Sequence, residues 1–294
     1  MSETVIQVTS LGKRIKGKTI LEDISFEINQ GDCVALIGPN GAGKTVLMSC
    51  ILGDKKPSSG QVLIDGKAGK AKNKIAVLLQ ENTIPNSLKV EELIAFFQSI
   101  SDNPLTNQEV QELLQFKEDQ YQQFADKLSG GQRRLLAFVL CLIDKPKILF
   151  LDEPTAGMDT STRQRFWEIV NDLKKAGTTI LYSSHYIEEV EHTADRILVL
   201  HQGKLIRDTT PYAMRHEEKE KQVTLPSSRF VSIVQGLPDI YEITEKRDVI
   251  SFMTKDIEKV WQSLENSGCR ISDIEIQNKT LLDSLFDSTR EDKA

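Results

Sequence analysis

The sequence predicts an α/β fold built on a mainly parallel sheet, followed by a small C-terminal α+β domain. Short apolar strands alternate with helical segments, and polar clusters follow three of these strands. Such alternation is typical of a parallel sheet covered on both faces. A charged stretch over 215–222 precedes a second run of elements. We therefore expect one domain over 1–214 and another over 215–294, with the charged stretch as a linker or a solvated helix end.

The first elements form two groups. Apolar residues at every second position predict antiparallel strands over 4–28. A buried strand over 32–38 then leads into a glycine-rich loop and a helix that stops at Gly53. Strand-like segments over 60–67 and 74–80 follow, joined by a lysine-rich turn.

A helix-rich insert is predicted over about 84–145, because its apolar residues follow a helical period. The sheet then resumes. A strand, a helix, a second strand, a second helix and a hairpin are predicted over 146–154, 162–177, 178–185, 187–195 and 196–208.

The C-terminal region predicts a β-α-β-β-α-β order, which is that of ferredoxin-like domains. The six elements are expected over 222–225, 227–235, 239–244, 248–254, 255–267 and 270–277. A final helix over 279–289 carries an apolar stripe of Leu281, Leu282, Leu285 and Phe286. We favour packing of this stripe on its own domain over contact with a partner.

The composition supports a large core and argues against broad nucleic-acid binding. Of 294 residues, 39% are hydrophobic and the formal net charge is −6, whereas nucleic-acid-binding faces are usually basic. The four cysteines have no metal-ligand spacing, so thiols of a reducing cytosol are expected. No signal peptide is evident, and the longest apolar run, 135–143, is too short for a bilayer. Any membrane association would require a partner.

The segment "GPNGAGKT" fits the phosphate-binding pattern GxxxxGK[ST]. Its backbone N–H groups would surround phosphates, Lys44 would reach the outer phosphates, and the Thr45 hydroxyl could ligate Mg²⁺. The following helix adds its positive N-terminal end. This phosphate loop consists of Gly38, Pro39, Asn40, Gly41, Ala42, Gly43, Lys44 and Thr45.

Polar residues end three other strands, where open α/β sheets place their ligands. Asp152 could hold Mg²⁺ through water, and Glu153 could polarise an attacking water. His185 could bond a γ-phosphate or orient that water, and Gln80 could reach both Mg²⁺ and the water. Taken singly, the acids could also be turn or cap residues, and His185 and Gln80 ordinary surface side chains.

A second anion receptor is predicted at "LSGGQRRLLAFVLCLI". Ser129 stands at an N-cap position, and Gly130 and Gly131 leave the helix end open. Such a contact contributes about 0.3–1 kcal/mol, up to about 2 when partly buried, so it could complete a nucleotide site but not form one alone. In a head-to-tail pair, each nucleotide would lie between one chain's phosphate loop and the other's Ser-Gly-Gly.

The complete set of motifs resembles the ATP-binding subunit of an ABC transporter. In the family's order they are the phosphate loop, Gln80, "LSGGQ" (128–132), "ILFLDE" (148–153), "AGMD" (156–159) and "SSH" (183–185). The resemblance implies a P-loop NTPase fold with a RecA-like core, an antiparallel β subdomain and a helical subdomain. It also implies binding of ATP and Mg²⁺ and an ATP-sandwich dimer.

The resemblance assigns roles to individual residues. Glu153 resembles the catalytic base, Asp152 the Mg²⁺-holding acid and His185 the switch residue. Asp159 resembles a contact across the dimer. The trans γ-phosphate clamp would comprise Ser129, Gly130, Gly131 and Gln132.

The implied partners are a second ATP-binding subunit, either a copy or a homologue, and a separate transmembrane permease that docks near Gln80. The chain would then lie at the cytoplasmic face of the membrane. The tail "GKLIRDTTPYAMR" and the extra domain resemble ATPases of drug, antibiotic and peptide exporters. Two features depart from the family. Ile15 replaces the usual adenine-stacking aromatic, and the helix after "LSGGQ" is unusually apolar beyond Arg133 and Arg134.

A soluble ABC-type ATPase acting on nucleic acid or ribosomes is the alternative. It is motivated by the lysine-rich turn with Lys67, Lys70, Lys72 and Lys74. A solvated hairpin explains those lysines better. Relatives of that type usually carry two cassettes or a long coiled coil, and this chain has neither. The sequence therefore favours an exporter ATPase, with no nucleic-acid partner expected.

Overall fold

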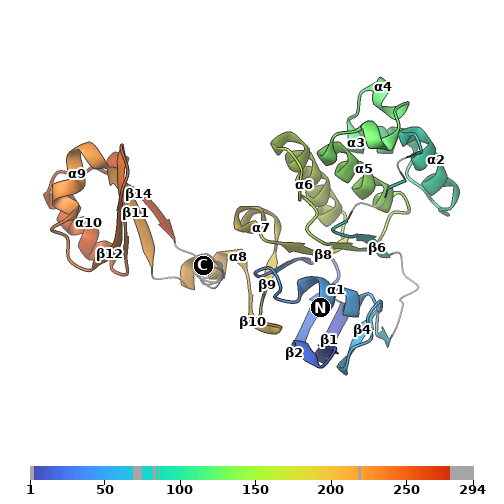
Figure 1. Ribbon diagram of the computed structural model, residues 1–294, viewed down its shortest axis with the longest axis horizontal. Coiled ribbons are helices and arrows are strands. Elements are labelled where there is room, and N and C mark those ends of the chain that lie inside the picture. Colours follow the sequence, from blue (N-terminus) through green and yellow to red (C-terminus); the bar gives the residue numbers. More distant parts are fainter. Residues whose placement is uncertain (1–2, 69–74, 82–83, 86, 218–219, 279–294) are drawn as a thin grey trace. The chain divides into compact units, whose positions relative to one another are not determined.

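A computed structural model describes residues 3–68, 75–81, 84–85, 87–217 and 220–278 (Figure 1). Contacts divide the chain into two compact units, Met1–Thr210 and Pro211–Ala294. The division falls slightly before the predicted boundary at 214/215, and that boundary stays a prediction. The charged stretch contains the end of helix α8 (Pro211–Glu217) and the start of strand β11 (Lys221–Pro226).

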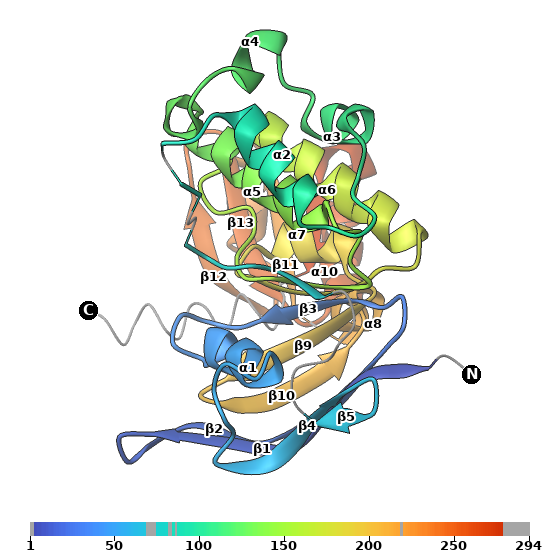
Figure 2. The ribbon, with the colours of Figure 1, turned by 90° about the vertical axis from the view of Figure 1, so that its right-hand side faces the viewer.

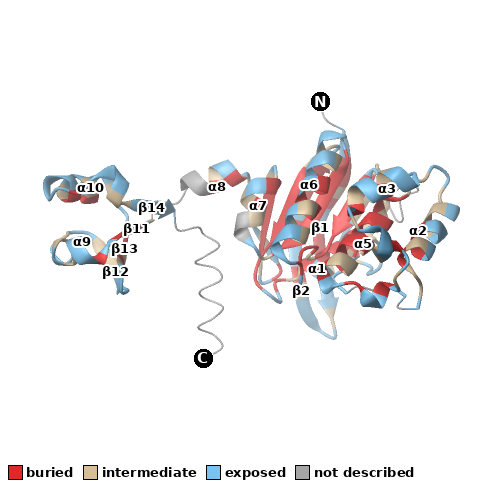
Figure 3. Ribbon diagram, turned by 90° about the horizontal axis from the view of Figure 1, so that it is seen from above, coloured by how far each residue is buried: buried red, intermediate tan, exposed pale blue. Residues whose placement is uncertain are grey.

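The first unit is organised around a six-stranded sheet of order β10-β9-β3-β8-β7-β6. Neighbouring strands from β6 to β9 are parallel, and β10 is an antiparallel edge strand. Every residue of β3, β7 and β8 is buried, which Figure 3 shows as a continuous buried layer. The strands are β3 (Cys33–Ile37), β6 (Ile75–Leu78), β7 (Ile148–Leu151), β8 (Thr179–Ser184), β9 (Arg196–His201) and β10 (Lys204–Thr209).

The predicted N-terminal strands form a separate antiparallel sheet of order β2-β1-β4-β5. Its strands are β1 (Thr4–Ile15), β2 (Lys18–Asn29), β4 (Ser59–Ile64) and β5 (Lys67–Ala68). Helix α1 (Lys44–Ile51) lies between the two sheets (Figure 2). Buried Leu47 of α1 shares one apolar core with Ile6 of the small sheet and Leu36 of the large one. This core fixes the start of α1 against both sheets.

The other face of the parallel sheet is covered by helices (Figure 2). They are α2 (Val90–Ser99), α3 (Asn107–Leu114), α4 (Glu118–Tyr121), α5 (Gly130–Leu142), α6 (Thr160–Lys175) and α7 (Ile187–Thr193), with a 3₁₀ turn at Ala125–Lys127. Aromatic rings connect two of these helices to the sheet. The Phe138 and Phe166 centroids are 4.4 Å apart, and the Trp167 and Tyr182 centroids 5.1 Å apart. The helices predicted within 84–145 are therefore present. Within the described ranges, no helix combines the length and apolar character needed to span a membrane.

The second unit has the predicted β-α-β-β-α-β order. After α8 and β11 come α9 (Ser227–Val234), β12 (Ile240–Glu245), β13 (Val249–Thr254), α10 (Ile257–Asn266) and β14 (Glu275–Asn278). The sheet has the order β12-β13-β11-β14, and each neighbouring pair is antiparallel. Its own core includes Phe230, Phe252 and Leu264.

One predicted strand of this unit is shorter than expected. The sequence predicted a strand over 270–277, but Ile271–Asp273 is a 3₁₀ turn and β14 begins at Glu275. The Arg270 N–H donates to the Asp273 carboxylate (3.1 Å), which closes the turn and delays the strand. The predicted helix over 279–289, with its apolar stripe, lies outside the described residues.

The two tryptophans allow the cores of the two units to be tested separately. Trp167 is buried in the first unit and Trp261 packs against the core of the second. We expect Phe252→Ala to lower the free energy of unfolding reported by Trp261 by about 3–5 kcal/mol, because it removes a fully buried ring. Denaturant titrations in a Trp167→Phe background would measure this change. In a Trp261→Phe background the transition reported by Trp167 should stay in place, and an equal shift there would contradict two separate cores.

Candidate nucleotide site

The phosphate loop connects β3 to α1, and its glycines are required by the local geometry. A Cβ on Gly38 would lie 2.0 Å from the Leu200 carbonyl oxygen. Gly43 is the N-cap of α1 at φ 107° and offers no side chain to the helix end. The first backbone N–H groups of α1 therefore receive no side-chain cap, and such groups are suited to bind an anion.

The hairpin between β9 and β10 supports this loop from behind. The Gly203 N–H donates to the Ala42 carbonyl at 3.0 Å, and the Gly203 carbonyl accepts from the Glu22 N–H at 2.9 Å. Gly203 has a φ of 78°, and a Cβ there would lie 2.2 Å from the Ile20 oxygen. The phosphate loop is thus held by backbone contacts that run from the large sheet to the small one.

Lys44 carries a positive charge inside the loop. Its side chain is 6% exposed, and Nζ donates to the carbonyls of Gly38 (2.7 Å) and Pro39 (3.4 Å). Burial lowers the pKa of Lys44, while the charges of Glu153 and Asp152 act in the opposite direction. A buried ammonium group held by two carbonyls of the loop is suited to bind phosphate oxygens.

Asp152 follows β7 and is bonded through both carboxylate oxygens. It accepts from the Thr45 hydroxyl at 2.9 Å and from the Ser183 hydroxyl at 2.5 Å. A hydroxyl beside a carboxylate offers the oxygen ligands that Mg²⁺ prefers. Among the described residues, no group of three His, Cys, Asp or Glu side chains could hold a metal ion. The Thr45 hydroxyl and the Asp152 carboxylate fit Mg²⁺ that also takes ligands from substrate phosphates.

Glu153 is the residue on which the predicted catalytic side chains converge. Its Oε2 accepts from the Gln80 amide at 3.0 Å, and its Oε1 lies 3.7 Å from His185 Nδ1. Its φ is 45°, a strained value for this residue type, and its N–H donates to Ser183 Oγ at 2.8 Å. Gln80, Glu153 and His185 follow β6, β7 and β8, so the structure brings them together at one sheet edge.

The signature segment (128–132) and Asp159 form a second group. Ser129 caps α5, and its hydroxyl accepts from the Gln132 N–H while Gln132 Oε1 accepts from the Ser129 N–H. A Cβ on Gly131 would lie 3.2 Å from the Asp159 carboxylate, and Gly130 faces Gly157. Within the described part of the chain, no hydrogen bond or ion pair connects Ser129–Gln132 to the phosphate loop.

Asp159 itself caps α6. Its carboxylate accepts from the Thr162 N–H at 3.0 Å, from the Ser161 hydroxyl at 2.7 Å and from the Thr162 hydroxyl at 2.8 Å. These bonds, that of the Thr162 N–H foremost, hold the pKa of Asp159 well below its usual range. Ile15 belongs to neither of these groups. It lies half-exposed at the end of β1, opposite Lys18.

Two residues that the structure places at the site had no role in the sequence analysis. Ser183 is buried and contacts both Asp152 and Glu153. Its place within the "SSH" motif was the available signal. Arg134 is 1% exposed and donates to main-chain oxygens after β6 and β7. A cation in an otherwise apolar helix was its only sequence signal.

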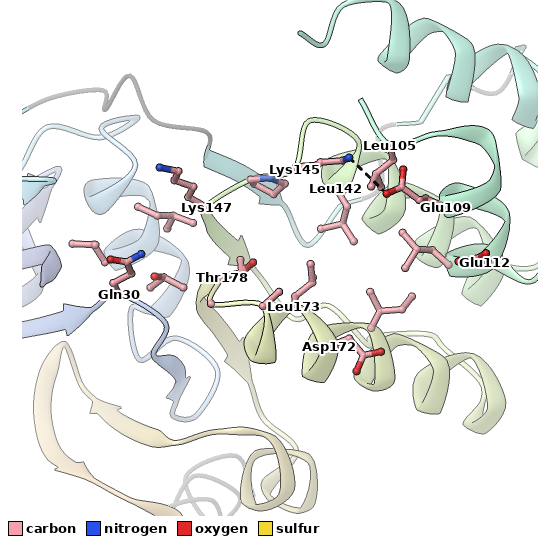
Figure 4. A pocket seen from close by; sticks show the side chains of 18 of the residues that line it. Gln30, Leu105, Glu109, Glu112, Leu142, Lys145, Lys147, Asp172, Leu173 and Thr178 are labelled. Atoms are coloured by element: carbon pink, nitrogen blue, oxygen red, sulfur yellow. Dashed lines mark ion pairs between the residues drawn. The ribbon is translucent and has the colours of Figure 1, made fainter. Parts of the chain in front are cut away.

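The first unit also contains a cavity of about 890 Å³, which lies away from the predicted site residues. Figure 4 shows Leu142, Leu173 and Thr178 along its wall, with the Lys145–Glu109 ion pair (3.6 Å) at one side. It lies at the amino ends of β7 and β8, whereas the predicted site residues follow their carboxyl ends. None of the predicted site residues lines it, so the cavity is separate from the predicted site.

The parallel sheet, the phosphate loop before α1 and the carboxylates after β7 together define a P-loop NTPase. The sequence profile of the ABC transporter family matches residues 21–156. Solved structures agree with the fold. An ATP-binding subunit of an ABC transporter (25% identical, TM-score 0.64) covers 72% of this chain and 92% of its own. The cbiO1 protein of Clostridium perfringens (26%, TM-score 0.62) covers 72% and 90%.

Sequence relatives agree as well. Nod factor export ATP-binding protein I of Rhizobium johnstonii is 33% identical over 228 residues, 74% of this chain and 73% of that protein. The linearmycin resistance ATP-binding protein LnrL of Bacillus subtilis is 34% identical over 213 residues, 69% and 68% of the two chains. The chain belongs to the ABC transporter family, as an ATP-binding subunit that hydrolyses ATP.

We expect Ser183→Ala to impair turnover. The change removes the acceptor of the Glu153 N–H and one donor to Asp152, and leaving a buried group unpaired costs about 1–3 kcal/mol. Steady-state assays should show kcat reduced at least about tenfold, as expected for a displaced catalytic group. Ser25→Ala is the control, since it removes a similar acceptor, that of the Ser10 N–H, from the antiparallel sheet. Equal kcat values for the two variants would contradict the role of Ser183.

Proposed function

We propose that the chain powers export of a drug, an antibiotic or a peptide, together with a second ATP-binding subunit and a separate membrane permease. The observation that carries the proposal is the convergence of Gln80 and His185 on Glu153, beside a phosphate loop whose Lys44 faces inward. This arrangement supports ATP hydrolysis by side chains that meet at one edge of the parallel sheet. The export function rests on the relatives, whose names specify Nod factor export and linearmycin resistance.

The proposed roles follow from the contacts. The N–H groups of the loop and Lys44 bind the phosphates, while Thr45, Asp152 and Gln80 would hold Mg²⁺, which neutralises phosphate charge when bound. Glu153 accepts a proton from the attacking water. The bond from the Gln80 amide orients its carboxylate.

His185 lies near the other oxygen of the Glu153 carboxylate. Its proposed role is to contact the γ-phosphate. Ile15 is proposed beside adenine, where aliphatic packing replaces ring stacking. Its half-exposed place at the end of β1 is compatible with such a contact.

The second subunit, a copy or a homologue, completes each site. In the signature segment, Ser129 caps α5, and Gly130 and Gly131 are the first two residues of that helix. Asp159 lies beside Gly131. Because no described bond links this group to its own phosphate loop, we assign it to the nucleotide of the neighbouring subunit. A cassette with the same fold, 21% identical to this chain, has been solved as a dimer bound to ADP and phosphate.

The permease is proposed to dock next to Gln80, which would place the chain at the cytoplasmic face of the membrane. Leu79 precedes Gln80 and is 55% exposed, as an apolar contact residue would be. Nothing in the described residues favours the nucleic-acid alternative. Lys70, Lys72 and Lys74 of its motivating turn lie outside them, and no nucleic-acid partner is proposed.

Replacing the proposed base should separate binding from hydrolysis. We expect Glu153→Gln to bind ATP, to lose hydrolysis by about 10²-fold or more, and to accumulate an ATP-bound dimer. Size-exclusion chromatography with and without ATP would detect the dimer, and phosphate release would measure the rate. A Glu153→Gln protein with wild-type turnover would rule out the proposed base.

Mixing two inactive variants tests the shared site. Lys44→Ala disables the phosphate loop, and Ser129→Arg blocks the signature segment. A mixed dimer pairs the intact loop of one with the intact signature of the other, so turnover should rise to about a quarter of wild type for independent sites and random pairing. If the mixture were no more active than the two variants assayed apart, each site would belong to one chain.

A further inference from the structure

We propose that Arg134 is a positioning residue that holds the main chain around Gln80 and Glu153 in the arrangement needed for hydrolysis. This inference rests on the proposed function, because it concerns the orientation of the proposed base. Arg134 lies within helix α5, one turn beyond Ser129. The side chain points into the protein, where it is 1% exposed.

The guanidinium bridges two segments that are far apart in sequence. On the β7 side, Nε donates to the Pro154 carbonyl at 3.0 Å, and Nη2 donates to those of Asp152 (3.0 Å) and Glu153 (3.3 Å). On the β6 side, Nη1 donates to the carbonyls of Leu79 and Gln80. A guanidinium presents five N–H donors in one rigid plane, which is what allows one side chain to reach both segments.

These carbonyls lie just beyond the regular sheet. The regular pairing of β6 with β7 ends at Leu78 and Leu151, and one further bond follows it, from the Asp152 N–H to the Leu78 carbonyl (2.8 Å). Gln80 and Glu153 lie beyond this last bond. Glu153 moreover has a φ of 45°, which persists only where its surroundings enforce it. Ser183 binds its N–H and Arg134 its carbonyl. The peptide groups on both sides of the proposed base are therefore held from opposite directions.

The charge of Arg134 supports a role beyond packing. Burial lowers the pKa of the guanidinium to about 10, so the group is still protonated at neutral pH. Five main-chain carbonyls accept hydrogen bonds from this one cation. Arg134 therefore fixes the positions of these carbonyls in addition to contributing to stability.

The test compares Arg134→Lys and Arg134→Met with the matched control Arg165→Lys. Arg165 also donates to main-chain carbonyls, those of Glu112 and Leu113, but on the side of the 890 Å³ cavity. We expect both Arg134 variants to lower kcat about 10- to 100-fold, the size of effect that follows from small misplacement of catalytic groups. The KM for ATP and the Kd of a fluorescent ATP analogue should change less than about threefold, because the phosphate loop is untouched.

The stability readout separates positioning from folding. Thermal unfolding followed by circular dichroism should show a lower melting temperature for Arg134→Met, because the carbonyls lose their donor, but the variant should still be folded at the assay temperature, where its kcat is lost. Arg165→Lys should keep its kcat whatever its melting temperature. Wild-type kcat in either folded Arg134 variant would overturn the proposal. So would failure of both variants to fold, because Arg134 would then be structural only.

The proposal can fail independently of the proposed function. If Glu153→Gln is inactive and the Arg134 variants turn over normally, Glu153 remains the base and only the positioning role is lost. If Glu153→Gln itself is active, the proposed function fails whatever Arg134 does.

Discussion

The parallel register of the large sheet is the constraint on which the site depends. Leu151 pairs with Leu78 on one side and Tyr182 on the other, and Ile37 pairs with Ser184. The four strands therefore end within two residues of one another, and whatever follows each strand lies at one edge. A slip of one residue in any pair would move its polar end residue away from the others. The apolar, fully buried strands β3, β7 and β8 specify that register by packing on both faces.

The same edge concentrates buried charge of both signs. Lys44 and Arg134 are cations with almost no exposure, and Asp152, whose charge acts on both, is 3% exposed. Carbonyl oxygens solvate both cations, and hydroxyls of Thr45 and Ser183 solvate the carboxylate. A buried charge is tolerated only when it is bonded in this way. The site is thus preorganised around charge before any phosphate enters, which reduces the reorganisation needed during hydrolysis.

The sequence was sufficient to predict those parts of the site that depend on local pattern. Strand ends after apolar runs placed Gln80, Glu153 and His185 at one edge, and the serine before two glycines predicted the cap of α5. Arg134 escaped prediction because its acceptors come from two loops elsewhere in the chain. The contact of the signature segment with Asp159 likewise requires the packing of α5 against α6. In the second unit, a local carboxylate bond replaced the start of a predicted strand with a 3₁₀ turn.

Helix α5 connects the two kinds of contact that the proposed dimer would need. Its N-cap, Ser129, would face the neighbour's nucleotide, and Arg134 holds the Glu153 and Gln80 backbone of its own subunit. Arg134 lies five positions after Ser129, a rise of about 7.5 Å along a rigid element. ATP can shift a dimer toward closure only by binding the closed form better than the open one. In the closed dimer, ATP that contacts the start of α5 also acts on the helix that carries Arg134. Closure of the dimer and orientation of Glu153 therefore depend on the same helix.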